Sequence, residues 1–320
     1  MNKTKNKTIG IVGGGQLGRM TILEARKMDI RVIVLTPEHP SPASDIADDY
    51  IIGSLYDEDK IRELASKCDI LTYEIEHINV AVLEEIEKSG KIVNPSAKVL
   101  KVIQDKSKQK VLLQANNLPT SNWDYINDDN LIDMINKYGY PVVQKSCTGG
   151  YDGKGVFVLK SEADIPNMIK GESFFEEYVP FEKEIAIMVA RNARGQVKTY
   201  PLVDMEFDPT TNMCDITVCP AKVSKEVEEK AKEIATKVIE ALDGYGIFGV
   251  EMFLTKDGEI LINEVAPRPH NSGHYTIEGC YTSQYEQYLR AIMNLPLGAT
   301  NYIKPNVMIN LFGEVGDSGK

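Results

Sequence analysis

Short runs of β-branched residues alternate with amphipathic segments along the first part of the chain. We expect helices at TILEARKM, KIRELASK and AVLEEIEKSG, where apolar residues recur every three or four positions. The expected strands are KTIGIV, RVIVLT, ADDYIIG, DILTYE and KIV. Regular alternation of strands and helices is typical of a parallel sheet with helices on its faces. The pattern therefore predicts an N-terminal, Rossmann-like α/β domain over residues 1–100.

Beyond this region the pattern becomes mixed. The segment Val99–Asn117 has the periodicity of one helix, which ends before Pro119. Short strands, a helix near Asn130–Lys137 and a glycine-rich loop follow, up to about Val189. Over Lys225–Leu242 the apolar residues fall on one face of a helix. Strands flank this helix on both sides, so the pattern predicts an α+β layer.

Composition and charge narrow the class of protein. The chain has 320 residues, 42% of them hydrophobic, which is enough for two or three packed units. Its net charge of -11 argues against nucleic acid as a partner, because binding a phosphate backbone needs excess positive charge. No apolar run is long enough to cross a bilayer, and the basic N-terminus leads straight into a strand, so we expect neither a membrane partner nor a signal peptide. The five cysteines form no CxxC pair, which favours a reducing cytoplasm.

A GxGxxG motif, formed by Gly13, Gly15 and Gly18, directly follows the first expected strand. This spacing is the dinucleotide fingerprint, but on its own it is a weak signal. The acidic residue that should end the second strand and hold the ribose is missing, since Thr36 stands there. We therefore disfavour NAD or FAD and expect a tight turn whose helix N-terminus holds some other anion, with Gln16 above it.

The run TGGYDGKG, from Thr148 to Gly155, closely follows an apolar segment that ends in Lys145. Glycines leave a loop with many free backbone N–H groups, which suits a polyphosphate that the loop must cover. The run is not a Walker A motif, because it lacks the first glycine and the final Ser or Thr. A glycine-rich hairpin tip is the simpler alternative. The nearby lysine favours phosphate binding.

Two carboxylates, Glu251 and Glu264, lie on either side of a predicted hairpin. With Asp257–Gly258 at the centre of the turn, Glu251 falls opposite Glu264 and Phe253 opposite Ile262. Directly opposed residues have Cβ atoms about 5 Å apart, and two like charges so placed destabilise a sheet unless they are neutralised. Magnesium with nucleotide phosphates would neutralise them. The alternative is two solvated acids on an exposed strand face.

The segment VAPRPHNSGH follows the second carboxylate. Its prolines prevent a helix, so His270 and His274 need not lie one turn apart, and zinc is disfavoured. Arg268, His270 and Asn271 lie just beyond the proposed metal, where they could bind a planar anion through several hydrogen bonds. Alternatively, the arginine only caps carbonyl groups of the loop.

In this order, GGGQLGRM, TYEIEHI, GGYDGKG, EEYVPFEKEIAIMVARN and APRPHNSGH resemble the N5-carboxyaminoimidazole ribonucleotide synthetases of purine biosynthesis, a family of the ATP-grasp superfamily. The resemblance spans nearly the whole chain. It implies an N-terminal pre-ATP-grasp domain over residues 1–100 and an ATP-grasp domain over 101–299, with a small lid subdomain at about 119–185. Relatives continue after VMINLFGE into a small domain with a basic, phosphate-binding segment. We expect residues 300–320 to be the truncated start of that domain.

The resemblance implies that ATP phosphorylates bicarbonate to carboxyphosphate, which carboxylates the exocyclic amine of 5-aminoimidazole ribonucleotide. It implies magnesium, or manganese in its place, on Glu251 and Glu264. The residues implied in catalysis are Arg268, His270, Asn271, Tyr151 and Asp152. Those implied to hold ATP are Lys106, Lys145, Gly150, Tyr151, Asp152, Gly153, Lys154, Gly155, Val156, Glu176, Glu177, Tyr178, Val179, Glu184, Asn263 and Glu264. Those implied to contact the ribonucleotide are Gln16, Leu17, Glu74, Glu76 and Arg268.

Two rival classes remain open. Another ATP-grasp carboxylate-amine ligase, such as a formate-dependent or glycinamide ribonucleotide enzyme, would share the ATP half and differ in APRPHNSGH and around Gln16. A nucleotide-binding module without turnover would keep Lys145 but lose one metal-binding acid, and both acids are present here. The resemblance also implies a cytoplasmic homodimer.

Overall fold

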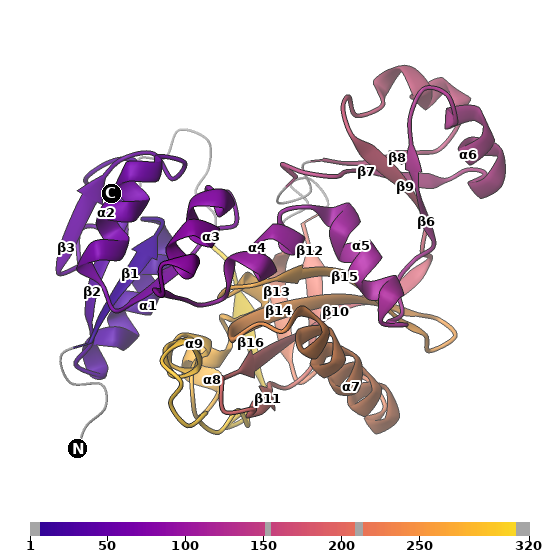
Figure 1. Cartoon of the computed structure of the whole chain (residues 1–320). Coiled ribbons are helices and arrows are strands. Elements are labelled where there is room, and N and C mark those ends of the chain that lie inside the picture. Colours follow the sequence, from indigo (N-terminus) through magenta and orange to yellow (C-terminus); the bar gives the residue numbers. More distant parts are fainter. Residues whose placement is uncertain (1–6, 151–154, 209–213, 312–320) are drawn as a thin grey trace.

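The computed structural model of the chain describes residues 7–150, 155–208 and 214–311. They form three sheets that follow one another in the sequence (Figure 1). The N-terminal sheet lies at one end of the molecule, the largest sheet lies in the middle, and a small sheet projects at the other end. No helix in the described ranges has the length and apolar character that a membrane span requires.

The N-terminal sheet is parallel throughout, with the strand order β3-β2-β1-β4-β5. Its strands are β1 (Thr8–Val12), β2 (Arg31–Thr36), β3 (Asp49–Ile52), β4 (Ile70–Tyr73) and β5 (Ile92–Val93). The helices between them are α1 (Gln16–Lys27), α2 (Glu58–Lys67) and α3 (Val80–Lys88). The predicted parallel α/β sheet is confirmed.

The central sheet is antiparallel, with the order β15-β14-β10-β12-β13-β16 and with β11 beside β10. Its strands are β10 (Phe181–Arg191), β11 (Val197–Thr199), β12 (Val203–Phe207), β13 (Cys214–Cys219), β14 (Gly246–Thr255), β15 (Ile260–Ala266) and β16 (Asn306–Ile309). Alternate residues of β10 enter two different hydrophobic clusters. Helix α7 (Lys225–Leu242) belongs to one cluster and α9 (Gln284–Ile292) to the other, so the helices cover opposite faces of the sheet. The short helix α8 (Thr276–Gly279) precedes α9.

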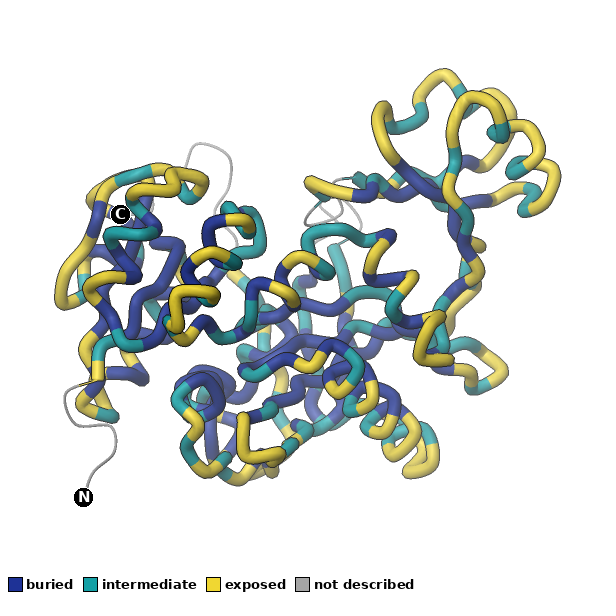
Figure 2. Tube along the Cα trace, in the orientation of Figure 1, coloured by how far each residue is buried: buried dark blue, intermediate teal, exposed yellow. Residues whose placement is uncertain are grey.

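The small sheet has the order β6-β9-β7-β8 and is antiparallel. Its strands are β6 (Trp123–Ile126), β7 (Val142–Ser146), β8 (Val156–Leu159) and β9 (Ser173–Glu177). Helix α6 (Leu131–Tyr138) and the 3-10 helix η1 (Glu162–Asn167) accompany it. Figure 2 shows that its outer parts are largely exposed, whereas the strands of the central sheet are mostly buried.

The prediction of one helix over Val99–Asn117 is wrong. Two helices, α4 (Ala97–Ile103) and α5 (Lys106–Ala115), occupy this stretch. The chain becomes extended at Asp105, whose carboxylate accepts hydrogen bonds from the backbone N–H groups of Ser107 and Lys108 and so caps the second helix. The periodicity hid the break because both helices bury apolar residues. The helices predicted near residues 130–137 and over 225–242 are confirmed by α6 and α7.

The register of the β14–β15 hairpin differs from the prediction near the turn. Its turn is one residue longer, since the N–H of Thr255 bonds to the carbonyl of Glu259 and Gly258 has a φ of 80°. Phe253 therefore pairs with Leu261, and its predicted pairing with Ile262 is wrong. A β-bulge next to Glu251 then shifts the register by one residue, so Glu251 does lie opposite Glu264.

Candidate active site

A cavity of about 510 Å³ lies between the central sheet, the small sheet and the loop that follows β4 of the N-terminal sheet. This loop contributes Glu76 and His77 to the walls, and the α4–α5 segment contributes as well. The predicted site residues that line it are Glu76, Lys106, Lys145, Gly150, Val156, Glu176, Glu177, Tyr178, Val179, Glu184, Glu251, Asn263, Glu264, Arg268, His270 and Asn271. The predicted residues Tyr151, Asp152, Gly153 and Lys154 lie outside the described residues.

The opposed carboxylates Glu251 and Glu264 form one wall of this cavity. Burial, together with the charges of Glu264 and Glu184, raises the pKa of Glu251 to about 8. Burial alone would also raise the pKa of Glu264, but the ammonium group of Lys106, 2.6 Å away, outweighs it and lowers that pKa. In the described ranges no group of three or more His, Cys, Asp or Glu side chains could hold a metal by itself. Two carboxylates do suit a magnesium ion whose remaining ligands are phosphate oxygens.

A buried ionic cluster forms the floor of the cavity. The carboxylate of Glu176 lies between two lysines, 2.6 Å from Nζ of Lys145 and 2.7 Å from Nζ of Lys110. Lys145 also bonds to Asn263 at 2.9 Å. Burial alone would raise the pKa of Glu176, but the charges of Lys145 and Lys110 lower it to about 2. These contacts hold the ammonium group of Lys145 in place at the edge of the cavity.

Lys110 is a residue that the sequence analysis missed. Its Nζ donates to the hydroxyl groups of Thr120 and Ser121, at 2.7 and 2.8 Å, as well as to Glu176. It thereby joins helix α5 to the small sheet. The sequence carried no local signal for it, because the positions one turn away on α5 are mostly polar: Lys106, Ser107, Leu113 and Gln114.

The chain that links the small and central sheets lines another part of the cavity. Residues Glu177–Val179 lead out of β9, and Phe181 stacks on Phe253 with ring centroids 4.8 Å apart. Glu184 faces the same space from β10, and burial raises its pKa to about 7. Gly155 accepts a hydrogen bond from the backbone N–H of Ser146 but does not line the cavity. This part of the cavity combines aromatic rings with the carboxylate of Glu184, a combination that suits the flat base and the hydroxyl groups of a nucleoside.

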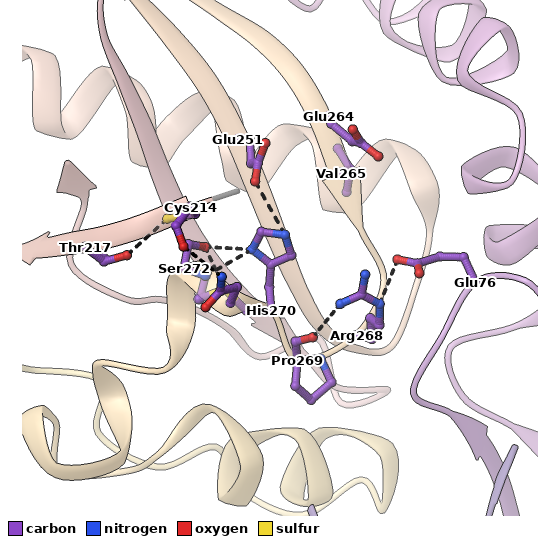
Figure 3. A network of polar contacts seen from close by, with 12 residues as sticks. Glu76, Cys214, Thr217, Glu251, Glu264, Val265, Arg268, Pro269, His270 and Ser272 are labelled. Carbon is purple, nitrogen blue, oxygen red and sulfur yellow. Dashed lines mark hydrogen bonds and ion pairs between the residues drawn. The ribbon is translucent and has the colours of Figure 1, made fainter. Parts of the chain in front are cut away.

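The loop after β15 carries Arg268, His270 and Asn271, which all line the cavity. Figure 3 shows Arg268 and His270 with their partners. Arg268 makes an ion pair with Glu76 at 2.8 Å and also donates to the carbonyl of Pro269, so loop anchoring is one part of its role. It joins the N-terminal sheet to the central sheet at the cavity.

His270 lies between Glu251 and Ser272. Burial, followed by the charge of Arg268, lowers the pKa of His270 to about 3, so the ring is neutral near pH 7. The backbone N–H of Ser272 donates to its Nδ1, which places the remaining proton on Nε2, 3.4 Å from Glu251. His274 instead directs its Nδ1 to Gln284. His270 can therefore donate a hydrogen bond into the cavity.

The glycines of the GxGxxG motif surround a carboxylate of the protein itself. Glu74 accepts hydrogen bonds from the backbone N–H groups of Gly15 and Gly18, at the N-terminus of α1. A Cβ atom on Gly13 would lie 2.4 Å from Glu74 Cγ, so only glycine fits there. Gln16 lies exposed on the same turn. The anion predicted at this helix end is thus an internal one.

The predicted ribonucleotide contacts are only partly brought together. Glu76 and Arg268 line the cavity, whereas Gln16, Leu17 and Glu74 do not. Gln104, which the sequence analysis missed, lines it and donates to the carbonyls of Glu76 and Ile78. It fixes the backbone on which Glu76 is carried.

Two models of known domain families match this chain. Residues 111–285 match the model of the ATP-grasp domain, and residues 6–104 match that of the ribonucleotide synthetase preATP-grasp domain. The sheets described above are those of an ATP-grasp protein with an N-terminal preATP-grasp domain, as predicted.

Named relatives define the family more closely. The N5-carboxyaminoimidazole ribonucleotide synthase of Bacillus subtilis is 38% identical over 311 residues, covering 96% of this chain and 81% of the relative. The crystal structure of N5-carboxyaminoimidazole ribonucleotide synthetase from Thermotoga maritima has a TM-score of 0.89 at 49% identity, covering 97% of this chain and 82% of that one. An Aspergillus clavatus synthase in complex with ADP and 5-aminoimidazole ribonucleotide has a TM-score of 0.91 at 35% identity, covering 98% and 84%. The chain belongs to the N5-carboxyaminoimidazole ribonucleotide synthase family.

Longer relatives carry more than this chain does. The phosphoribosylaminoimidazole carboxylase of Ogataea methanolica is 40% identical over 329 residues, which cover 98% of this chain but 60% of the relative. For the homologous carboxylase of Saccharomyces cerevisiae the covered share is 56%. The chain thus spans little more than half the length of these carboxylases.

Proposed function

We propose that this protein uses ATP and bicarbonate to carboxylate the exocyclic amine of 5-aminoimidazole ribonucleotide. The observation that carries the proposal is the shared cavity in which an opposed pair of carboxylates, two lysines and the Arg268–Asn271 loop face one another. The family supports the identity of the substrates, since a solved relative is described as a complex with ADP and 5-aminoimidazole ribonucleotide.

The proposed reaction has two steps. A bicarbonate oxygen attacks the γ-phosphorus of ATP and the bond to the ADP oxygen breaks, which gives ADP and carboxyphosphate. The amine nitrogen then attacks the carboxyl carbon, the C–O bond to phosphate breaks, and the amine loses a proton. Both steps need charge neutralisation and the exclusion of water more than they need covalent help from the protein.

Lys106 and Lys145 would neutralise the transferring phosphoryl group. Both ammonium groups line the cavity, where they pair with Glu264 and Glu176. We propose magnesium on Glu251 and Glu264, where it would shield the phosphate charge; the opposed carboxylates support this, because they repel one another without a cation. For the loop Gly150–Val156, the proposed role as a cover over the phosphates rests on the family resemblance.

Arg268, His270 and Asn271 would hold bicarbonate and then carboxyphosphate. The guanidinium group supplies charge, and the neutral ring of His270 supplies an N–H from Nε2. We propose that the backbone of Glu176–Val179 holds the adenine and that Glu184 accepts from the ribose hydroxyls. The apolar lining beside them supports this assignment.

The remaining proposals concern the setting of the enzyme. We propose domain limits at residues 1–100 and 101–299, with a lid at about 119–185, which the spans of the matching family models support. We also propose a cytoplasmic homodimer. Five buried cysteines with free thiols support a reducing compartment, and the dimer rests on the family resemblance alone.

Release of ADP by the purified protein tests this function. We expect release to require bicarbonate and to rise when 5-aminoimidazole ribonucleotide is added. Stimulation by formate or by glycine in place of bicarbonate would favour another ATP-grasp ligase. A protein that binds ATP but releases no ADP under any of these conditions would be a nucleotide-binding module.

A further inference from the structure

The last described strand brings an asparagine to the edge of the active-site cavity. Strand β16 pairs with β13, and Asn310, which directly follows β16, continues the ladder through a 2.9 Å hydrogen bond from its N–H to the carbonyl of Asp215. This places it beside Cys214, which lines the cavity. Asn310 lies beyond residues 111–285, the span that matches the ATP-grasp model.

The side-chain amide of Asn310 has two acceptors. Its Nδ2 lies 2.6 Å from the backbone carbonyl oxygen of Cys214 and 2.7 Å from Oδ1 of Asn271. These bonds use both hydrogens of the amide nitrogen. Nδ2 of Asn271 in turn lies 3.3 Å from the same carbonyl of Cys214. Both asparagine side chains thus donate to one main-chain oxygen, and Asn310 also donates to Asn271.

This arrangement determines the positions of the oxygen and the nitrogen in each side-chain amide. A backbone carbonyl oxygen can only accept, so the atom of Asn310 beside it must be the nitrogen. That nitrogen donates its second hydrogen to Asn271, so the atom of Asn271 that receives it must be the oxygen. The nitrogen of Asn271 directs one hydrogen to the carbonyl of Cys214, the acceptor that it shares with Asn310. Its other hydrogen has no partner among the residues that the structure describes.

We propose that Asn310 is a positioning residue that holds Asn271 with its N–H, and not its carbonyl, available to the anion in the cavity. The inference rests on the proposed function, in which Asn271 binds bicarbonate and carboxyphosphate. Both are rich in negatively charged oxygens, which attract an N–H and repel an amide oxygen. If Asn271 rotated by half a turn about its last side-chain bond, the same residue would repel the substrate.

Two substitutions remove the donor in different ways. Asn310→Leu keeps the branched shape at a larger volume and donates nothing, so only the longer, 3.3 Å bond to Cys214 is left to set the orientation of Asn271. Asn310→Asp turns the donor into an acceptor, and Asn271 then satisfies it only by rotating its N–H toward Asp and its oxygen toward the cavity. The matched control is Asn306→Leu, because Asn306 begins the strand that Asn310 follows and, within the described ranges, its side-chain amide donates to the carbonyl of Lys304 and not to Asn271.

The experiment measures ADP release against bicarbonate and against ATP, with 5-aminoimidazole ribonucleotide saturating. We expect both Asn310 variants to raise the KM for bicarbonate about tenfold, equivalent to about 1.4 kcal/mol, while the KM for ATP stays within about twofold. In an Asn271→Ala background the Asn310 variants should have no further effect on the KM for bicarbonate. The Asn306 variant should match the wild type.

An unchanged KM for bicarbonate in a folded Asn310 variant would overturn the inference. So would a further tenfold loss in the Asn271→Ala background, since Asn310 would then act by another route. Circular dichroism and the melting temperature identify a variant that has failed to fold. If one of the Leu and Asp variants does not fold, the other still tests the inference. If ADP release by the wild-type protein does not depend on bicarbonate, the proposed function is refuted, and the inference with it.

Discussion

Replacing Lys110 by methionine tests whether the buried ionic cluster supports both the fold and the nucleotide site. The ammonium group of Lys110 has three partners, and the lysine side chain is 4% exposed. Methionine keeps the apolar stem and removes the charge. Glu176 would then keep a single cationic partner, Lys145, in a buried position where its own side chain is 5% exposed.

The size of the effect depends on how far the buried carboxylate of Glu176 is left without a cation. Removing one member of a buried ion pair typically costs about 3–5 kcal/mol, because the remaining charge is left unpaired. Here the carboxylate keeps its second lysine, so we expect the lower end, about 3 kcal/mol. Lys145 would be held more tightly by Glu176 and would be less available to a phosphate, so the KM for ATP should rise about tenfold.

The single tryptophan provides the assay. Trp123 lies in β6 directly opposite Glu176 on β9, so its fluorescence reports unfolding of the small sheet in urea. Lys108→Met is the control, because Lys108 lies on the same helix but its side chain is 54% exposed in its pair with Asp105. That variant should lose less than about 1 kcal/mol. A Lys110→Met protein that is as stable as this control would refute the reasoning.

Three further predictions follow from the same structure. Glu264→Gln should reduce bicarbonate-dependent ADP release about 100-fold or more at saturating magnesium, while the melting temperature changes little because the substitution also relieves the repulsion between the two opposed carboxylates; turnover near the wild-type rate would contradict the metal assignment. Glu74→Gln should lower stability to thermal unfolding by about 2 kcal/mol, because one of the two glycine N–H groups would then face an NH₂ group; an unchanged melting temperature would exclude this. Glu176 has a pKa of about 2 in the folded protein against an ordinary value of 4.5, so its stabilising effect is complete above about pH 5 and is lost as the pH falls toward 2. The urea midpoint should therefore fall between pH 5 and pH 3, by more in the wild type than in Lys110→Met.

The elements of the fold could largely be predicted from the sequence because their patterns are local. Helix α7 has the predicted bounds, since its apolar stripe lies within the segment and its capping residue, Ser224, directly precedes it. The stretch from Val99 to Asn117 could not be predicted in the same way. Its break depends on the capping carboxylate of Asp105 and on a hydrogen bond from Lys106 N–H to the carbonyl of Cys147, which is distant in sequence.

The candidate site was predictable where residue type and order carry the chemistry. The opposition of Glu251 and Glu264 was predicted from a simple turn, and two departures, a longer turn and a bulge, happen to cancel. The partner of the glycine motif was beyond reach, because Glu74 comes from the end of a different strand.

Charged and polar pairs across sheets were also hidden from the sequence. Lys110 meets Glu176 only after helix α5 packs beneath the small sheet. Asn310 meets Asn271 only after β16 pairs with β13. Such contacts join residues that are far apart in the chain, so no local sequence pattern predicts them.

The most direct test of the central claim is a crystal structure with magnesium and a non-hydrolysable ATP analogue. We expect a metal ion held between Glu251 and Glu264, with phosphate oxygens as its other ligands and with Lys106 released from Glu264 toward the phosphates. Triphosphate bound elsewhere, with no metal on these carboxylates and the Lys106–Glu264 pair intact, would contradict it.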